Sequence, residues 1–179
     1  MTRLDEAIRQ LNKGRLKEGQ EILEQMRREE GDDPEILYNL GICYSEQGEL
    51  ERSIETLEKC IEVAPDYANA CAALGFSYAR AGRTEAAVEV LEKAREKDPN
   101  NAFALKNLGS VYGNLGRPDE AIECFERARG IQPDAPDVLY GLAYAHERKG
   151  HIQQSDALHT RIIEMGEPSE FADLAKEAR

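Results

Sequence analysis

Apolar and polar residues recur along this chain at the spacing of amphipathic helices. Leu37, Leu40, Gly41 and Tyr44 recur at spacings of three and four residues, which places them on one helical face. Similar segments return along the chain and are separated by glycine or proline, which interrupt helices. We predict ten paired helices and one last helix, over residues 2–13 and 17–30, 35–47 and 50–64, 69–81 and 84–97, 102–115 and 118–130, 136–149 and 152–165, and 169–178.

The helical pattern has a period of 34 residues. Several independent columns keep this step without an insertion, which indicates an internal repeat. The columns are Gly14, Gly48, Gly82, Gly116 and Gly150; Gly41, Gly75 and Gly109; Leu40, Leu74, Leu108 and Leu142; Tyr44, Tyr78 and Tyr112; and Pro65, Pro99 and Pro133.

Single residues of the repeat have clear physical roles. Gly41 lies in the middle of a predicted helix, where glycine costs about 1 kcal/mol relative to alanine. We therefore expect a second helix to approach it closely, where a β-carbon would clash. Gly48 lies between two helical segments and is expected to adopt the left-handed conformation that often ends a helix. Pro65 is expected to end the second helix of its pair.

The three middle units resemble the tetratricopeptide repeat. They share the pattern L-x-x-L-G-x-x-Y, followed by glycine, a small residue, a bulky apolar residue, another small residue and proline; only the third unit, with Cys71, replaces the first leucine. The end units depart from the pattern, as terminal repeats commonly do. The resemblance implies an all-α fold, an α-α superhelix in which five helical hairpins form a right-handed solenoid with a C-terminal capping helix. We expect one domain over 1–179, with repeats near 1–33, 34–67, 68–101, 102–135 and 136–169 and a cap at 170–179.

The resemblance also implies a concave groove, lined by the first helix of each repeat, that binds a peptide or protein segment. The corresponding places hold aromatic side chains, which supply apolar contact area and a polar group, together with amide and basic side chains. The expected groove residues are Tyr38, Asn39, Ile42, Phe76, Arg80, Phe103, Lys106, Asn107, Asn114, Tyr140, Tyr144 and Arg148.

Some groove residues allow two interpretations. Asn39 and Asn107 could hydrogen-bond a peptide backbone, or could simply follow the ordinary repeat pattern. The aromatic residues could face the groove or pack between repeats.

Some members of the family grip a C-terminal carboxylate with lysine, asparagine and arginine at five places. Neither window of this chain carries that set, so we expect a more apolar, internal segment as the ligand. The two windows read Tyr38, Ile42, Ala73, Phe103 and Asn107, and Ala72, Phe76, Asn107, Asp137 and Gly141.

Charge and composition narrow the partners. The net charge of −12 disfavours nucleic acid and anionic membranes, because both would be repelled. No apolar stretch approaches the ~20 residues that span a bilayer. The beginning of the sequence lacks the apolar run of a signal peptide, so a cytoplasmic location is expected. The partner should therefore be a protein or peptide, and the chain itself a monomer or a weak homo-oligomer.

Candidate catalytic chemistry is sparse. The four cysteines form no C-x-x-C pair, and Cys60 and Cys71 occupy core columns, so buried thiols are expected. His146 and His159 replace a tyrosine and an apolar residue of the repeat, which favours packing over metal ligation. We expect no enzyme activity, cofactor or metal site. Two other hypotheses stay open, a self-assembling structural module and a regulatory domain of a multi-component enzyme or secretion system.

Overall fold

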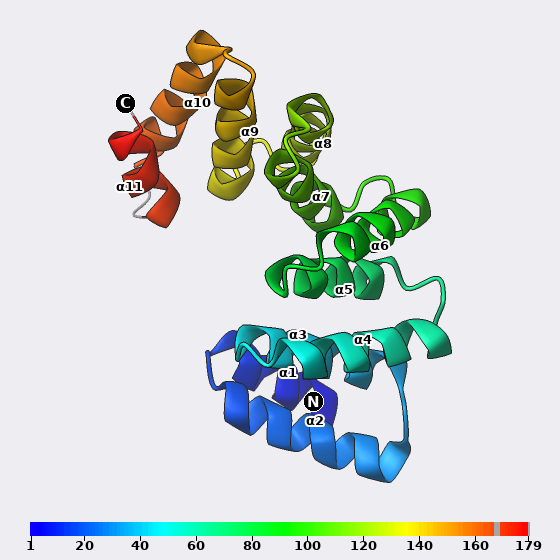
Figure 1. Cartoon of the computed structure of the whole chain (residues 1–179). Helices are drawn as coiled ribbons and strands as arrows, with labels where there is room; N and C mark the ends of the chain where they lie inside the picture. The colour runs from blue at the N-terminus through cyan, green and yellow to red at the C-terminus, as the bar shows by residue number, and fades with distance from the viewer. Residues whose placement is uncertain (167–168, 179) are drawn as a thin grey trace. The chain divides into compact units, whose positions relative to one another are not determined.

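The structure is a computed structural model that describes residues 1–166 and 169–178. These residues form helices and short connections, and consecutive helices pack as hairpins, which confirms the predicted all-α fold class. The helices belong to two compact units, Met1–Lys97 and Asp98–Arg179, and Figure 1 shows their order along the chain. A single domain over the whole chain stays a prediction. Arg179, which the prediction placed in the cap, lies outside the described residues.

The first unit consists of three helical hairpins. Each hairpin packs its two helices together, and the second hairpin contacts both the first and the third. The helices are α1 (Arg3–Asn12), α2 (Leu16–Glu30), α3 (Pro34–Glu46), α4 (Leu50–Val63), α5 (Ala68–Arg80) and α6 (Thr84–Lys97).

The second unit consists of two hairpins and a last helix that contacts both helices of the final hairpin. All predicted helices are present, and their ends agree with the prediction to within two residues. The helices are α7 (Ala102–Asn114), α8 (Pro118–Ile131), α9 (Pro136–Arg148), α10 (Ile152–Glu164) and α11 (Glu170–Glu177).

Helix beginnings follow from local chemistry. The Asp33 carboxylate accepts hydrogen bonds from the backbone amides of Glu35 and Ile36, and Pro34 occupies the first helical position of α3. Proline is tolerated there because the amide it lacks would have no partner within the helix. Asn101 caps α7 in the same way by accepting from the Ala104 amide at 2.9 Å. These caps explain why the helices begin where the repeat pattern places them.

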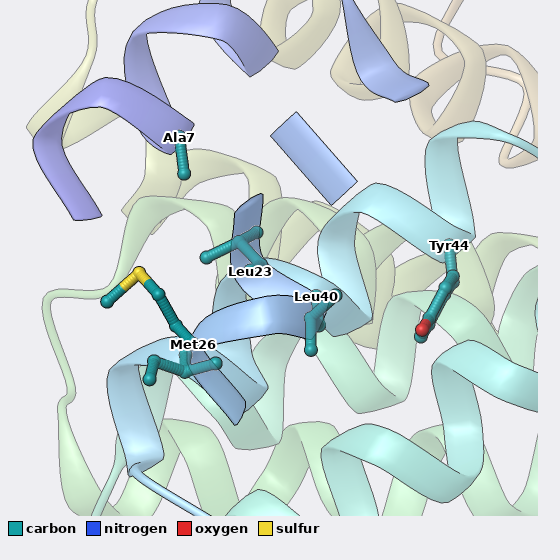
Figure 2. Close-up of a cluster of buried hydrophobic side chains, with 6 residues drawn as sticks. Ala7, Leu23, Met26, Leu40 and Tyr44 are labelled. Carbon is teal, nitrogen blue, oxygen red and sulfur yellow. The ribbon is translucent and has the colours of Figure 1, made fainter. Parts of the chain in front are cut away.

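The core is built from the repeated apolar columns. In the first unit, side chains from α1, α2 and α3 meet in one cluster (Figure 2). Its buried members are Ala7, Leu23, Met26, Ile36, Leu40 and Tyr44. Tyr44 and Leu40 come from the repeat pattern, whereas Ala7 stands where the three middle repeats have glycine. The first, atypical repeat therefore still contributes to a continuous core with its neighbour.

Two glycine columns act as the sequence predicted. A β-carbon on Gly41 would lie 2.4 Å from Cγ of Leu57, so α3 and α4 pack against each other where only a hydrogen fits. Gly48, between α3 and α4, has a φ of +79°, which is the left-handed conformation expected at the end of a helix. Both roles are confirmed.

The cysteines and His159 are buried. Cys43, Cys60, Cys71 and Cys124 are buried free thiols, which confirms the expected burial. His159 is only 3% exposed and its ring lies 5.7 Å from that of Tyr140. No helix among the described residues is long and apolar enough to cross a bilayer.

Candidate protein-binding faces

The first helices of consecutive hairpins lie against each other within each unit. In the first unit α3 contacts α5, and in the second unit α7 contacts α9. The expected groove residues therefore form two faces, each within one unit. The first-helix face of unit 1 consists of Tyr38, Asn39, Ile42, Phe76 and Arg80, and that of unit 2 consists of Phe103, Lys106, Asn107, Asn114, Tyr140, Tyr144 and Arg148. A continuous groove through both units stays a prediction from the sequence.

Tyr38 and Ile42 belong partly to the packing between repeats. Both are half-buried and contact the core cluster that contains Leu57 and Leu74. The Tyr38 ring also packs against Tyr67, with ring centroids 5.2 Å apart. Burial raises the pKa of the Tyr38 hydroxyl above its ordinary value. These side chains offer only part of their surface to a ligand.

Phe76 and Arg80 lie next to each other on α5. The Arg80 guanidinium carbon is 5.6 Å from the centroid of the Phe76 ring. Arg80 also donates hydrogen bonds to the carbonyl oxygen of Ser45 and, at 3.3 Å, to its hydroxyl. Ser45 lies in the last turn of α3, where a cation is favourable because the helix dipole places negative charge there. Arg80 thus joins α5 to α3 and holds a positive charge beside an aromatic ring.

The first-helix face of unit 2 carries the more exposed aromatic side chains. Phe103 on α7 is 41% exposed and Tyr144 on α9 is 43% exposed. Among the described residues with exposed large apolar side chains, these two are the aromatic ones. Lys106 forms an ion pair with Asp137 that joins α7 to α9, and its ammonium lies 5.5 Å from the Phe103 ring centroid. The face therefore combines apolar surface with a partly buried ion pair.

Tyr140 contacts the end of the unit as well as the face. Its ring centroid lies 5.7 Å from that of His159 on α10 and 5.8 Å from that of Phe171 on α11. It is half-buried, so the alternative of packing between elements applies to it in part. Asn114 and Arg148, at the ends of α7 and α9, are exposed.

The two asparagines already make a local hydrogen bond each. The Asn39 amide donates to the carbonyl oxygen of Glu35 at 2.7 Å, and the Asn107 amide donates to that of Phe103 at 2.8 Å. Asn107 is also buried, with 7% of its surface exposed. A peptide could reach the Asn39 amide more readily than the Asn107 amide. The role of both residues toward a ligand stays a prediction.

Sequence reasoning did not identify the partners of the two basic residues. Lys106 pairs with Asp137, 31 positions further along, and Arg80 bonds Ser45, 35 positions earlier. Separations close to the repeat length place such residues on neighbouring first helices, so the 34-residue period contained a signal for both contacts. Among the described residues, no group of three histidine, cysteine or acidic side chains is arranged to hold a metal ion.

Comparisons with known proteins agree with the repeat. Two profiles described as tetratricopeptide repeat match residues 10–74 and 67–134. A search of curated proteins found no significant match.

Solved structures extend the similarity over nearly the whole chain. MamA MSR-1 is 33% identical, with a TM-score of 0.70, and the alignment covers 90% of this chain and 93% of that one. MamA AMB-1 is 29% identical, with a TM-score of 0.68, over 96% of this chain and 94% of that one. A thermophilic TPR protein of Thermus thermophilus is 22% identical, with a TM-score of 0.85, over 98% and 96%. This last likeness concerns the fold alone.

Proposed function

Because the chain belongs to the tetratricopeptide repeat family, whose fold is that of a protein-interaction scaffold, we propose that it binds a segment of another polypeptide on its first-helix faces. The observation that supports this most is the exposure of Phe103 and Tyr144 on two adjoining first helices. Large aromatic side chains at protein surfaces are favourable anchors for a partner, because they bury much area with few rotatable bonds.

The chemistry of the face favours an internal apolar segment as the ligand. Most of the lysine, asparagine and arginine places of a carboxylate clamp are occupied by other residues, among them Ile42 and Phe76, and only Asn107 matches one of them. On the first-helix face of unit 2, the cation beside Phe103 is Lys106, and it is already paired with Asp137. A free terminal carboxylate would have to compete with Asp137 for this lysine, whereas apolar side chains can contact Phe103 and Tyr144 directly.

The test uses peptides selected from a random displayed library on the purified full-length chain. Calorimetry then measures the dissociation constant of each selected peptide for the wild type and for the double variant Phe103→Ala, Tyr144→Ala. We expect binding to weaken about tenfold or more, since removing aromatic anchors typically costs 1 to several kcal/mol, and ~1.4 kcal/mol is tenfold.

The control variant is Ile131→Ala, Ile152→Ala. It also truncates two exposed apolar side chains, 40% and 54% exposed, but these lie at the end of α8 and the beginning of α10. Binding to this variant should equal that of the wild type. If the aromatic variant keeps its helical circular dichroism and binds every selected peptide as the wild type does, the proposal is wrong.

A further inference from the structure

The junction between the first and second hairpins contains an arginine that contacts a tyrosine and two glutamates, one of which is Glu49 directly before α4. The guanidinium carbon of Arg52 on α4 lies 4.0 Å from the ring centroid of Tyr44 on α3. Arg52 also donates to the Tyr44 hydroxyl at 2.9 Å and forms an ion pair with Glu24 on α2 at 3.1 Å. The Tyr44 hydroxyl in turn donates to Glu24 at 2.9 Å. Stacking, charge and hydrogen bonding therefore all favour a guanidinium in this place.

The tyrosine and the first glutamate return one repeat later without the arginine, and Arg83 stands at the position that corresponds to Glu49. Glu58 and Tyr78 are the residues 34 positions after Glu24 and Tyr44, and the Tyr78 hydroxyl donates a hydrogen bond to Glu58 as its counterpart does. Burial and the neighbouring carboxylate raise the pKa of Tyr44 and of Tyr78 alike to about 12. The residue 34 positions after Arg52, however, is Ala86, whose side chain is a methyl group without charge.

An open pocket of about 440 Å³ lies at this second junction, between α4, α5 and α6. Glu58 and Tyr78 line it together with the apolar side chains of Ile61, Leu74, Ala86 and Val90. The first-helix face of unit 1 contributes none of these residues. The pocket therefore provides the acceptor, the ring and an apolar wall for a side chain that combines a long stem with a cation.

The charges around the pocket suit a basic ligand. Glu58, Glu62 and Glu89 line it with one cation, Lys93, which pairs with Glu89 at 2.7 Å. Arg83 approaches Tyr78 less closely than Arg52 approaches Tyr44, because its guanidinium carbon is 5.9 Å from the ring centroid. Arg83 also lies 3.6 Å from Glu51, which is outside the pocket. The face of Tyr78 thus lacks the close stacking that Arg52 gives Tyr44.

We propose that this pocket binds an arginine side chain from a basic segment of a partner protein. The guanidinium would stack on Tyr78 and donate to Glu58, as Arg52 does at the first junction, while the aliphatic stem contacts Ile61 and Val90. Arginine is favoured over lysine because a planar guanidinium can stack and donate at the same time. The site is separate from the first-helix faces, so each proposal can fail without the other.

The experiment follows the resonances of Tyr78 and Glu58 in the full chain by NMR. The probe is an acetylated and amidated peptide in which one arginine is flanked by leucines. The matched probe carries citrulline, which keeps the shape of arginine but lacks its charge. We expect saturable shifts at Tyr78 with the arginine peptide, and binding about tenfold weaker with the citrulline peptide.

Variants then test the assigned contacts. Ala86→Arg should place an arginine of the chain itself in the pocket, which raises the melting temperature and weakens binding of the arginine peptide about tenfold. Glu58→Gln should weaken binding to a similar degree while the helical signal is retained. Glu55→Gln removes one negative charge from an exposed place on the same helix, outside the pocket, and should leave binding unchanged.

Three results would overturn the proposal. The first is equal binding of the arginine and citrulline peptides. The second is wild-type binding by a folded Ala86→Arg variant, since its own arginine should occupy the pocket. The third is shifts that appear on the first-helix face, at Phe76 for example, and leave Tyr78 unmoved. The double variant Phe103→Ala, Tyr144→Ala should bind the arginine peptide as the wild type does, which separates this site from the proposed function.

Discussion

The contact between the two helices of a hairpin depends on the absence of single β-carbons. A β-carbon on Gly75 would lie 2.4 Å from Cγ of Leu91, and Leu91 is fully buried and cannot move aside freely. Gly113, also in a first helix, has no atom beyond its chain neighbours and its own helical backbone within 4 Å of the place that its β-carbon would take. Glycine is therefore required by packing at Gly75, whereas the space beside Gly113 would accept a larger side chain.

Replacing each of these glycines by alanine tests this difference. Gly75→Ala should destabilise the protein by roughly 1–2 kcal/mol, because overpacking costs about 1–3 kcal/mol and the better helix propensity of alanine recovers up to ~1 kcal/mol. Gly113→Ala should be neutral or stabilising by up to ~1 kcal/mol. Urea unfolding measures both, and equal effects of the two substitutions would contradict the packing argument.

At the scale of helices, the last hairpin replaces a tyrosine–arginine pair by two histidines. Tyr112 on α7 has the Arg117 guanidinium carbon 4.4 Å from its ring centroid. The corresponding residues of the next repeat are His146 and His151, whose Nδ1 atoms are 3.3 Å apart. Burial, followed by the effect of His151, lowers the pKa of His146 below 6.5. Charged neighbours also act on the pKa of His146: Glu126 raises it, whereas Arg129 and Lys149 lower it further.

This pair should make the stability of the second unit depend on pH. The unfolded chain protonates His146 near its ordinary pKa of 6.5, whereas the folded chain resists protonation. The stability that the neutral imidazole contributes is therefore complete above pH 6.5 and is lost as the pH falls toward the lower folded pKa. Between about pH 7.5 and about pH 5.5, the melting temperature of the wild type should fall by a few degrees more than that of His146→Tyr, His151→Arg. An identical decline in both proteins would rule out the histidine pair as its source.

The last helix covers the end of the final hairpin. Ala172 and Ala175 on α11 are buried, and Phe171 packs on Tyr140. Helix α11 contacts both α9 and α10, as expected of a cap that shields the apolar flank of a terminal repeat.

A matched pair of substitutions measures this packing. Ala175→Asp places a charge at a fully buried position and should lower the free energy of unfolding by roughly 2 kcal/mol or more. Ala178→Asp makes the same chemical change at an exposed position next to the end of α11 and should change it by less than about 0.5 kcal/mol. Thermal unfolding measures the melting temperatures of the two variants. Equal melting temperatures would show that α11 does not pack on α9 and α10.

At the scale of the whole molecule, stability should grow with the number of stacked hairpins. Unit 1 has core clusters that connect each hairpin to the next, such as the one joining Ile54 and Leu57 of α4 to Ala73 and Leu74 of α5. In repeat proteins each hairpin contacts its neighbours alone, so stability is approximately a sum over hairpins and their interfaces.

Fragments of the chain test this additivity. Residues 1–97, which form a compact unit of three hairpins, should fold into a helical protein on their own. A fragment of residues 1–66 lacks α5 and therefore its contact with α4. It should melt at a lower temperature than the fragment 1–97. Circular dichroism during heating gives the order of stability, and a fragment 1–97 that remains unfolded would show that unit 1 needs the rest of the chain.

The period of the sequence was sufficient to predict the helices, their order, the close contact at Gly41 and the left-handed turn at Gly48. Helix formation and hairpin packing depend on residues at most one repeat apart, and such local requirements recur visibly as columns. The packing partners of the groove residues could not be predicted in this way. The place of a residue in the repeat indicates which helix face it occupies, but not which side chains lie beside it. Tyr38 and Tyr140 illustrate this, since Tyr67 and Phe171 lie outside the repeat columns and partly cover them.

The pocket at Tyr78 is a property of the tertiary structure. Glu58, Tyr78 and Ala86 are spread over three helices, and their significance depends on the geometry of Glu24, Tyr44 and Arg52 one repeat earlier. The repeat columns show only that one place holds Arg52 in the second repeat and Ala86 in the third. Whether neighbouring side chains close the resulting space depends on packing between helices, and in this protein the space stays open. The repeat pattern thus determines the scaffold, while the sites on it follow from how side chains of different helices meet.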